Sequence, residues 1–311
     1  LLAYSSIENI GIIAMGLGVA LLGRALGQPA WVLLGMGGAL LHVWNHSLFK
    51  SLLFLNAGAV IHAAGTREID RMGGLAQRMP RVAALFALGA VAICALPPLN
   101  GFASEWLIYV GLFRTLGLGA EAGAPAAAMA AVALAMTGAL AVACFVKVFG
   151  AVFLGAPRQP EAGHSHEAPP VLLAPMAALA CGCVGLGLFP LFVAAPLEAA
   201  VRLWAAQPGL PRVAAAAPLA WFTVMGLVLA ALAGLAGLAL KRAVSGRVVR
   251  LGLTWDCGYA RPTARMQYSG SSLSDSLVKL VSFMLMPNRF LTALRGLSPR
   301  SSVFKSAVPD T

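Results

Sequence analysis

Six apolar stretches, each long enough to cross a membrane, constrain the fold of this chain more than any other feature of its sequence. A helix needs about 20 apolar residues to span the hydrocarbon layer. Several of the stretches are rich in Gly and Ala, which lets neighbouring helices pack closely in lipid. They lie near residues 3–23, 31–62, 82–117, 124–154, 171–194 and 217–240. The sequence therefore predicts an all-α, polytopic helical membrane protein whose transmembrane domain covers residues 1–240.

The charge distribution fits a membrane protein and excludes a nucleic-acid-binding one. Only 11% of the residues are charged and 59% are hydrophobic, although the net charge is +11. The basic residues lie between the apolar stretches and after residue 240, as in loops on the cytoplasmic side of a membrane. Residues 65–81 hold four arginines, and alternation of the spans then places 155–170 and the tail on the same side. We expect a multi-pass protein of the cell (inner or cytoplasmic) membrane.

The third apolar stretch is interrupted by the sequence LPPLNG, residues 96–101. Proline removes a backbone donor and glycine adds conformational freedom, so a continuous helix is not expected here. Broken backbone in a membrane needs protein or a water-filled cavity around it, and it is a common feature of transporters. Glu105 follows the break by four residues. The alternative is an ordinary proline kink with Glu105 at the membrane interface.

The tail, residues 241–311, is basic and contains a further mixed stretch at 272–297, which Pro287 interrupts. Its apolar residues alternate with Lys279, Arg289 and Arg295. This pattern favours an amphipathic helix lying along the membrane surface rather than a span. A docking element for a partner subunit is the alternative.

Three titratable residues lie in the apolar sequence LLHVWNHSLFKSLLFLN, residues 40–56. His42, His46 and Lys50 are four apart, so on a helix they form one stripe about 12 Å long. A lysine at the centre of a bilayer costs about 2.5–3.5 kcal/mol even on the scale with the smallest penalties, which indicates a functional role. Histidine exchanges protons near neutral pH, and a lysine withdrawn from water can lose its proton. The stripe predicts a proton pathway, and the alternative is structural, with the histidines bonded to carbonyls of neighbouring helices and Lys50 paired to a carboxylate.

Two further titratable residues have two interpretations each. Lys147 lies in an apolar stretch about 10 Å from its end, so it could extend to the headgroups or act as a proton relay. Glu8 stands beside Ser5, Ser6 and Asn9 at the start of an apolar helix. It could belong to the proton pathway or cap the helix near the interface.

The cysteines and the remaining histidines indicate no cofactor in this chain. Four of the five cysteines lie in apolar stretches, and none forms a CxxC pair suited to zinc or an iron–sulfur cluster. The loop GHSHEAPP contains His164 and His166 near Glu161 and Glu167. We interpret it as a solvated loop rather than a weak metal site.

Several motifs together identify a family. LLAYSSIENIG, LLHVWNHSLFKSLLFLNAGAVI, MGGLAQRMPR and ALPPLNGFASEWLIY resemble the antiporter-like proton-translocating subunits of respiratory complex I. The chain is more similar to the large membrane subunit of hydrogenase-4 and formate hydrogenlyase, and the tail TWDCGYARPTARMQYSGSS also resembles that branch. The resemblance covers nearly the whole chain.

The resemblance implies a fold of fourteen helices with two inverted five-helix repeats. This chain then begins at about the ninth helix and supplies the second repeat. His42, His46 and Lys50 match the family's His-x3-His-x3-Lys helix on its central hydrophilic axis. Lys147 matches the lysine of a later discontinuous helix that leads to the aqueous phase, and Glu105 follows the family's proline break.

The resemblance also implies partners and leaves two functions open. The family's first repeat, with its glutamate–lysine pair and central lysine, is not in this sequence, so we do not expect this chain to pump by itself. Other membrane subunits and peripheral hydrogenase-type subunits would accompany it, with nickel–iron and iron–sulfur centres in those partners. The alternative is a subunit of a multi-subunit cation/proton antiporter without a redox partner. The side of the tail also stays open, because its basic residues favour the cytoplasm whereas the fourteen-helix core implies the outer face.

Overall fold

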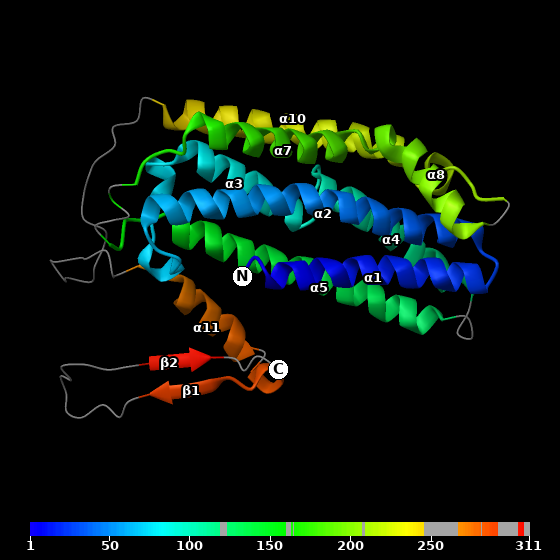
Figure 1. Ribbon diagram of the computed structural model, residues 1–311, viewed down its shortest axis with the longest axis horizontal. Coiled ribbons are helices and arrows are strands. Elements are labelled where there is room, and N and C mark those ends of the chain that lie inside the picture. The colour runs from blue at the N-terminus through cyan, green and yellow to red at the C-terminus, as the bar shows by residue number, and fades with distance from the viewer. Residues whose placement is uncertain are drawn as a thin grey trace.

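The computed structural model describes residues 1–118, 123–159, 163, 165–206, 209–245, 267–280, 282–291 and 304–307. Five helices in this part of the chain are long and apolar enough to cross a membrane. They are α1 (Tyr4–Ala25), α2 (Pro29–Ala64), α5 (Ala124–Phe153), α7 (Pro170–Leu188) and α10 (Leu219–Val244). The predicted polytopic helical membrane protein is confirmed, and Figure 1 shows the long helices side by side.

Proline in the first turn marks the start of several of these helices. Pro29 begins α2, Pro80 begins α3 (Pro80–Ile93) and Pro170 begins α7. The first helical position lacks an intrahelical partner for its N–H, so proline is tolerated there and its fixed φ favours the helix. Short elements connect the spans: η1 (Ile69–Arg71), η2 (Leu75–Gln77), η3 (Leu116–Leu118), η5 (Pro190–Val193), α8 (Ala194–Ala205) and α9 (Val213–Ala216).

The third apolar stretch forms two helices, α3 and α4 (Asn100–Thr115), separated by residues 94–99. The predicted interruption is confirmed, and the alternative of an ordinary kink is wrong because six residues leave the helix. In Figure 1, α3 begins at the end where α2 finishes, and α4 continues toward the opposite end. The two half-length helices therefore cross the bundle once between them.

Helix α2 lies at the centre of the bundle and packs against α1, α3, α4, α7, α8 and α9. It approaches α1 closely, because a Cβ atom at Gly35 would lie 2.5 Å from the backbone nitrogen of Ala20. The second half of α2 packs into one apolar core with α3, α5 and α7, and its first half packs with α4, α8 and α9. Any polar side chain on the inner face of α2 is thus surrounded by protein.

The loops after α2 and α5 and the start of the tail meet at one end of the bundle. The Gly74 N–H donates to Leu154 O over 2.9 Å, and the Ser271 N–H donates to the Asp70 carboxylate over 3.0 Å. These contacts join segments that the alternation of spans placed on one side of the membrane. That part of the predicted topology is confirmed.

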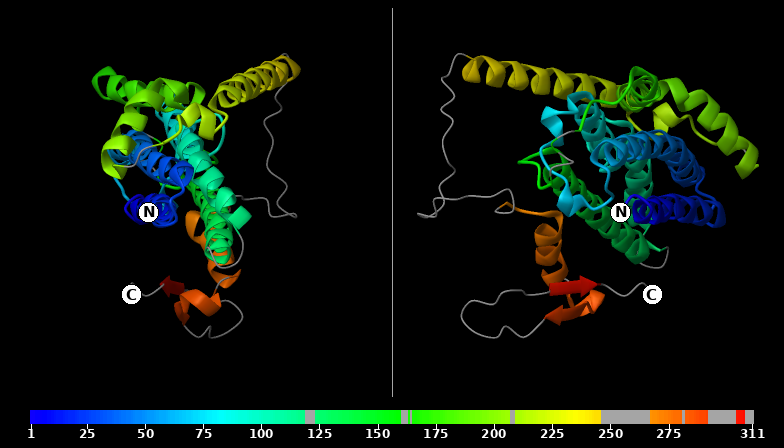
Figure 2. Two further views of the ribbon diagram at one scale, coloured as in Figure 1. Left: turned by 90° about the vertical axis from the view of Figure 1, so that its right-hand side faces the viewer. Right: turned by 60° about the vertical axis from the view of Figure 1, so that its left-hand side comes forward.

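The described part of the tail contains α11 (Gly270–Leu280), α12 (Ser282–Leu285) and two antiparallel strands, β1 (Asn288–Leu291) and β2 (Phe304–Ala307). Figure 2 shows these elements extending from one end of the bundle, while α10 lies along another flank. Pro287 precedes the first strand and lacks the backbone N–H that a continuing helix would need, and Met286 before it has a φ of 40° outside the helical range. The predicted helix over 272–297 is therefore wrong beyond Leu285.

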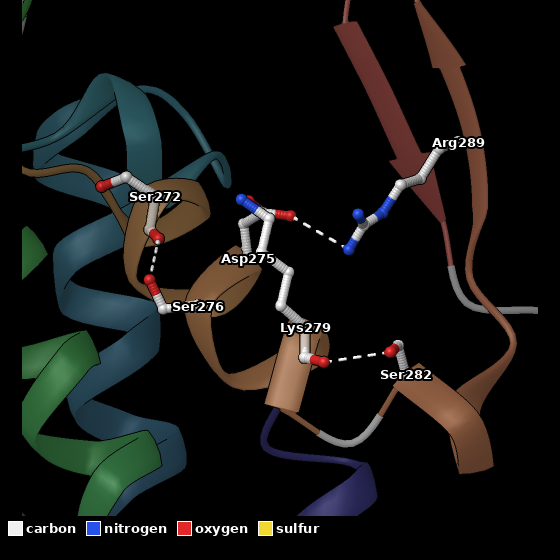
Figure 3. A network of polar contacts seen from close by, with 6 residues as sticks. All are labelled: Ser272, Asp275, Ser276, Lys279, Ser282 and Arg289. Carbon is white, nitrogen blue, oxygen red and sulfur yellow. Dashed lines mark hydrogen bonds and ion pairs between the residues drawn. The ribbon is translucent and has the colours of Figure 1, made fainter.

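The tail's charged side chains contact one another across these elements (Figure 3). Asp275 pairs with Lys279 at 2.6 Å and with Arg289 of β1 at 3.6 Å. The hydrogen bond from Lys279 lowers the pKa of Asp275 below its usual value. Ser276 and Ser282 also donate to backbone carbonyls one turn earlier. Lys279 and Arg289 are thus held by a shared carboxylate.

Candidate functional site

His42 joins three helices at the centre of the bundle. It lies on α2 and is only 1% exposed. Its Nε2 atom is 3.0 Å from Asn9 Oδ1 of α1, and its Nδ1 atom is 2.9 Å from Ser104 Oγ of α4. Both ring nitrogens therefore have side-chain partners on neighbouring helices, which a structural histidine bonded to helix carbonyls would not have.

Lys50 lies two helical turns further along α2 and is 7% exposed. Its Nζ atom donates to Ser5 Oγ and to Leu2 O, each over 2.5 Å, and lies 5.8 Å from the ring centroid of Phe54. All of these partners are neutral. Among the described residues Lys50 forms no ion pair, so the structural alternative of a carboxylate partner is wrong.

His46 lies between His42 and Lys50 on the same face of α2. Its ring packs edge-on against Phe49, with the centroids 5.5 Å apart. Its Nε2 atom is buried and has no hydrogen-bond partner in the described part of the chain. Buried polar atoms in folded proteins are normally satisfied by protein or ordered water. The stripe predicted from the sequence therefore forms, and a ring nitrogen of its middle member can hydrogen-bond to a water molecule.

The break between α3 and α4 lies against this polar network. Asn45 Nδ2 donates to Asn100 O over 2.6 Å and to Ser104 Oγ over 3.1 Å, which fixes the first turn of α4. A Cβ atom at Gly101 would lie 2.0 Å from Ala92 O, so only glycine fits where α4 meets the end of α3. At Gly187 a Cβ atom would lie 2.3 Å from Pro98 O, so α7 covers the break. Protein thus surrounds the interrupted backbone, as a membrane interior requires.

Two acidic residues flank the network. Glu105 on α4 is 5% exposed and has no hydrogen-bond partner among the described residues, so the alternative that placed it at the membrane interface is wrong. Glu8 is half-buried on α1 and lines a cavity of about 550 Å³ with Thr137 and Cys144 of α5. Because α1 begins at Tyr4 and Glu8 makes no capping bond, the capping alternative for Glu8 is also wrong.

Lys147 stands apart from the network. The resemblance placed it on a discontinuous helix, but α5 is continuous from Ala124 to Phe153, and the interrupted segment carries Glu105 instead. That expectation is wrong. The Lys147 Nζ atom donates to Ser274 Oγ of α11 over 2.7 Å, and Ser274 donates to Gly270 O over 2.9 Å. Lys147 thus contacts the tail helix at the loop end of the bundle.

We expect Lys147→Arg to keep transport activity and Lys147→Ala to loosen the tail. Arginine also has a long apolar stem and N–H donors for Ser274, whereas alanine removes the hydrogen bond. One hydrogen bond contributes about 1 kcal/mol. The protection of α11 against amide hydrogen exchange should therefore fall about fivefold in the Ala variant. Loss of transport in Lys147→Arg, with α11 still protected, would instead show that Lys147 relays protons and must lose its own proton during transport.

The sequence reasoning missed the uncharged members of the site. Asn45, Asn100 and Ser104 hold α2 to α4, and Asn9 holds α1 to α2. A sequence signal was available only for Asn45, an amide that follows His42 by three residues inside an apolar stretch. Asn45 and Asn9 are both fully or almost fully buried, which shows that they face protein rather than lipid.

The loop histidines and the cysteines lie elsewhere. His164 and Glu161 fall outside the described residues, as does Cys257. Glu167 accepts the Arg81 N–H over 2.8 Å at the start of α3, so it stabilises a helix N-terminus. The described cysteines, Cys94, Cys144, Cys181 and Cys183, are free thiols.

Comparisons with known proteins confirm the resemblance seen in the motifs. Residues 1–120 match the family model described as NADH:quinone oxidoreductase/Mrp antiporter, transmembrane region. The chain is 46% identical to formate hydrogenlyase subunit 3 of Escherichia coli (strain K12) over 73% of this chain and 38% of that protein. It is 45% identical to hydrogenase-4 component B of the same organism over 60% of this chain and 28% of that protein. The chain thus spans well under half the length of these two relatives.

A solved structure has the same fold. The membrane-bound sulfane sulfur reductase, an archaeal respiratory membrane complex, contains a chain that aligns with a TM-score of 0.58 and 21% identity. The alignment covers 91% of this chain and 48% of that one. At this identity the likeness shows the fold alone, and it agrees with the helical membrane fold of this chain.

Proposed function

We propose a function from the premise that residues 1–120 match the family model described as NADH:quinone oxidoreductase/Mrp antiporter, transmembrane region. In the proposal the chain is a proton-translocating membrane subunit of an oxidoreductase that resembles hydrogenase-4 and formate hydrogenlyase. It moves protons along a buried axis formed by His42, His46 and Lys50, with Glu8 and Glu105 beside that axis. The similarity to the two Escherichia coli subunits supports this branch of the family.

The observation that carries the proposal is that Lys50, among the described residues, donates hydrogen bonds only to neutral groups. A buried ammonium paired with a carboxylate resists deprotonation, because loss of its proton would leave an unpaired buried anion. Lys50 instead donates to a hydroxyl and a backbone carbonyl. When Lys50 loses its proton, neither of these two partners is left as an unpaired charge. Lys50 can therefore alternate between charged and neutral forms at low cost.

The geometry of α2 supports stepwise transfer between its titratable groups. Residues four apart rise about 6 Å along a helix, which exceeds a direct hydrogen bond. A bridging water is needed at each step, and the unpartnered Nε2 atom of His46 offers it a binding point. The negative charge of Glu8 attracts the Lys50 ammonium from α1. A change in the charge of Glu8 or of Glu105 would therefore change which groups along the axis hold a proton.

The proposal places redox chemistry in partner subunits. Nickel–iron and iron–sulfur centres there would carry the electrons, and their reaction would drive charge movement along the axis in this chain. We propose further membrane subunits and peripheral hydrogenase-type subunits as partners, in the inner (cytoplasmic) membrane. The alternative function is a subunit of a cation/proton antiporter without a redox partner, which the family description also includes.

The experiment that separates these functions uses membrane vesicles containing the complete complex. We expect H₂ or formate, with an electron acceptor, to drive proton uptake that a protonophore abolishes. An imposed Na⁺ or K⁺ gradient, without an electron donor, should drive none. Proton movement with the ion gradient alone, and none with the electron donor, would support the antiporter function and contradict the redox-coupled one.

A further inference from the structure

Ser104 has three polar neighbours around its hydroxyl, and one of them is a titratable ring nitrogen. Its Oγ atom lies 2.9 Å from His42 Nδ1, 3.0 Å from Gly101 O and 3.1 Å from Asn45 Nδ2. A hydroxyl has one hydrogen and two acceptor lone pairs. The Asn45 amide can only donate here and Gly101 O can only accept. Whether Ser104 donates to His42 or accepts from it therefore depends on the proton of His42 Nδ1.

The other ring nitrogen of His42 is fixed by Asn9. The Asn9 Nδ2 atom donates to Ser5 O over 2.7 Å, so Oδ1 faces His42 Nε2 at 3.0 Å. Rotating the amide by half a turn would place Oδ1 against Ser5 O, where two acceptors repel. An amide oxygen accepts hydrogen bonds and never donates one. Nε2 must therefore carry a hydrogen in both the neutral and the charged form of His42.

Only two arrangements satisfy these partners. In neutral His42, Nδ1 has a lone pair and accepts the Ser104 O–H, which leaves Gly101 O without that donor. In charged His42, Nδ1 carries the added proton and donates it to Ser104 Oγ. The Ser104 hydrogen then turns to Gly101 O, in the first turn of α4. The neutral form with its hydrogen on Nδ1 is excluded, because the Nε2 lone pair would face Asn9 Oδ1.

We propose that Ser104 is a positioning residue whose hydroxyl couples the protonation of His42 to the first turn of α4. The inference rests on the proposed function, since it takes His42 as a member of the proton axis. A proton from a water in the pathway binds Nδ1 and later returns to water, while Ser104 keeps its own hydrogen and changes only its acceptor. The helix that responds begins after the break and carries Glu105, so the switch joins the histidine stripe to that acid.

Other titratable side chains lie on α2 and on the elements packed against it. They include Glu8 on α1, His46 and Lys50 on α2, Cys94 at the end of α3, Glu105 on α4 and Cys183 on α7. Of the side chains packed around His42, only Ser104 and Asn9 contact its ring nitrogens. Substitution of these two residues therefore tests the switch without removing a titratable group.

The first measurement is ¹⁵N NMR of the full protein with labelled histidine, in which His42→Gln identifies the His42 signals. We expect wild-type His42 to be neutral with hydrogen on Nε2, or doubly protonated, and never neutral with hydrogen on Nδ1. Ser104→Ala removes the acceptor for a protonated Nδ1, so the doubly protonated fraction should fall. Asn9→Ala releases Nε2, so the excluded form should become populated. A His42 spectrum that is unchanged in both variants would overturn the inference.

The second measurement is proton uptake by vesicles with matched amounts of assembled complex. We expect Ser104→Ala to reduce uptake and Ser104→Thr, which keeps a hydroxyl at the same position, to restore it. Wild-type uptake in Ser104→Ala, alongside loss in Lys50→Ala, would overturn the switch and leave the proposed function intact. Wild-type uptake in both variants would overturn the proposed function itself. The NMR comparison of Ser104→Ala decides the inference even if the threonine variant fails to assemble.

Discussion

Lys50→Ala should abolish proton uptake while leaving the complex assembled. Alanine removes the titratable group from the axis, and no other described ammonium lies within the polar network of α1, α2 and α4. The partners that remain, Ser5 Oγ and Leu2 O, already bond to each other over 3.1 Å. Little polar surface is thus left unsatisfied. Proton uptake by vesicles, driven by the electron donor, should fall to the level of protonophore-treated vesicles.

Two further variants test whether Lys50 must lose its proton during transport or need only be positively charged. Lys50→Arg keeps a positive charge that cannot be deprotonated in a protein, so we expect it to fail as alanine does. Lys241→Ala is the matched control, because Lys241 is exposed in the last turn of α10. It should retain uptake. Normal uptake in Lys50→Ala, at equal amounts of assembled complex, would contradict a role for Lys50 in the pathway.

The sequence could predict the stripe on α2 because helical geometry is local. Spacing by four residues determines which side chains share a face, and the cost of charge in lipid determines that this face is inside. His42 and Lys50 are accordingly buried on one face of α2. The proton role of these residues stays a prediction, since burial and spacing do not measure transfer.

The partners of these groups could not be predicted in the same way. Asn9 and Ser104 are 33 and 62 residues from His42 along the chain. Their contact depends on how three helices are rotated against one another, which local periodicity does not determine. The error at Lys147 has a different source: the resemblance placed Lys147 on a discontinuous helix, whereas the chain is interrupted at Pro97 and Pro98 in an earlier stretch.

The tail shows the other limit of local patterns. Apolar and basic residues alternate through 272–297 as in an interfacial helix, yet the helix ends at Leu285 and a strand follows. Pro287 marks the change, but the pairing of β1 with β2 joins residues that are 13 to 19 positions apart. The spacing of apolar and basic residues in one segment does not show whether that segment pairs with a strand further along the chain.

Glu105→Gln should abolish proton uptake, which would identify Glu105 as a charge-carrying member of the pathway. Glutamine has the shape of a protonated glutamate but cannot ionise, so folding and assembly should be kept. Glu105 is 5% exposed and its carboxyl group has no hydrogen-bond partner among the described residues, although it lies one residue from Ser104. An unpaired carboxylate is costly in such a place. We therefore expect Glu105 to hold a proton at rest and to release it only when positive charge on the axis compensates.

The test for Glu105 needs a variant that keeps the charge and a control that loses one elsewhere. Glu105→Asp retains an ionisable group and should keep measurable uptake, reduced because its shorter side chain shifts the carboxyl group. Glu68→Gln removes an exposed carboxylate that pairs with Arg71 at 2.6 Å, and a surface pair of this kind contributes little. It should behave as wild type. If Glu105→Gln took up protons as well as Glu68→Gln, at equal assembly, the buried carboxyl group would be a structural feature of α4, and the pathway would have to pass from Lys50 through Glu8 alone.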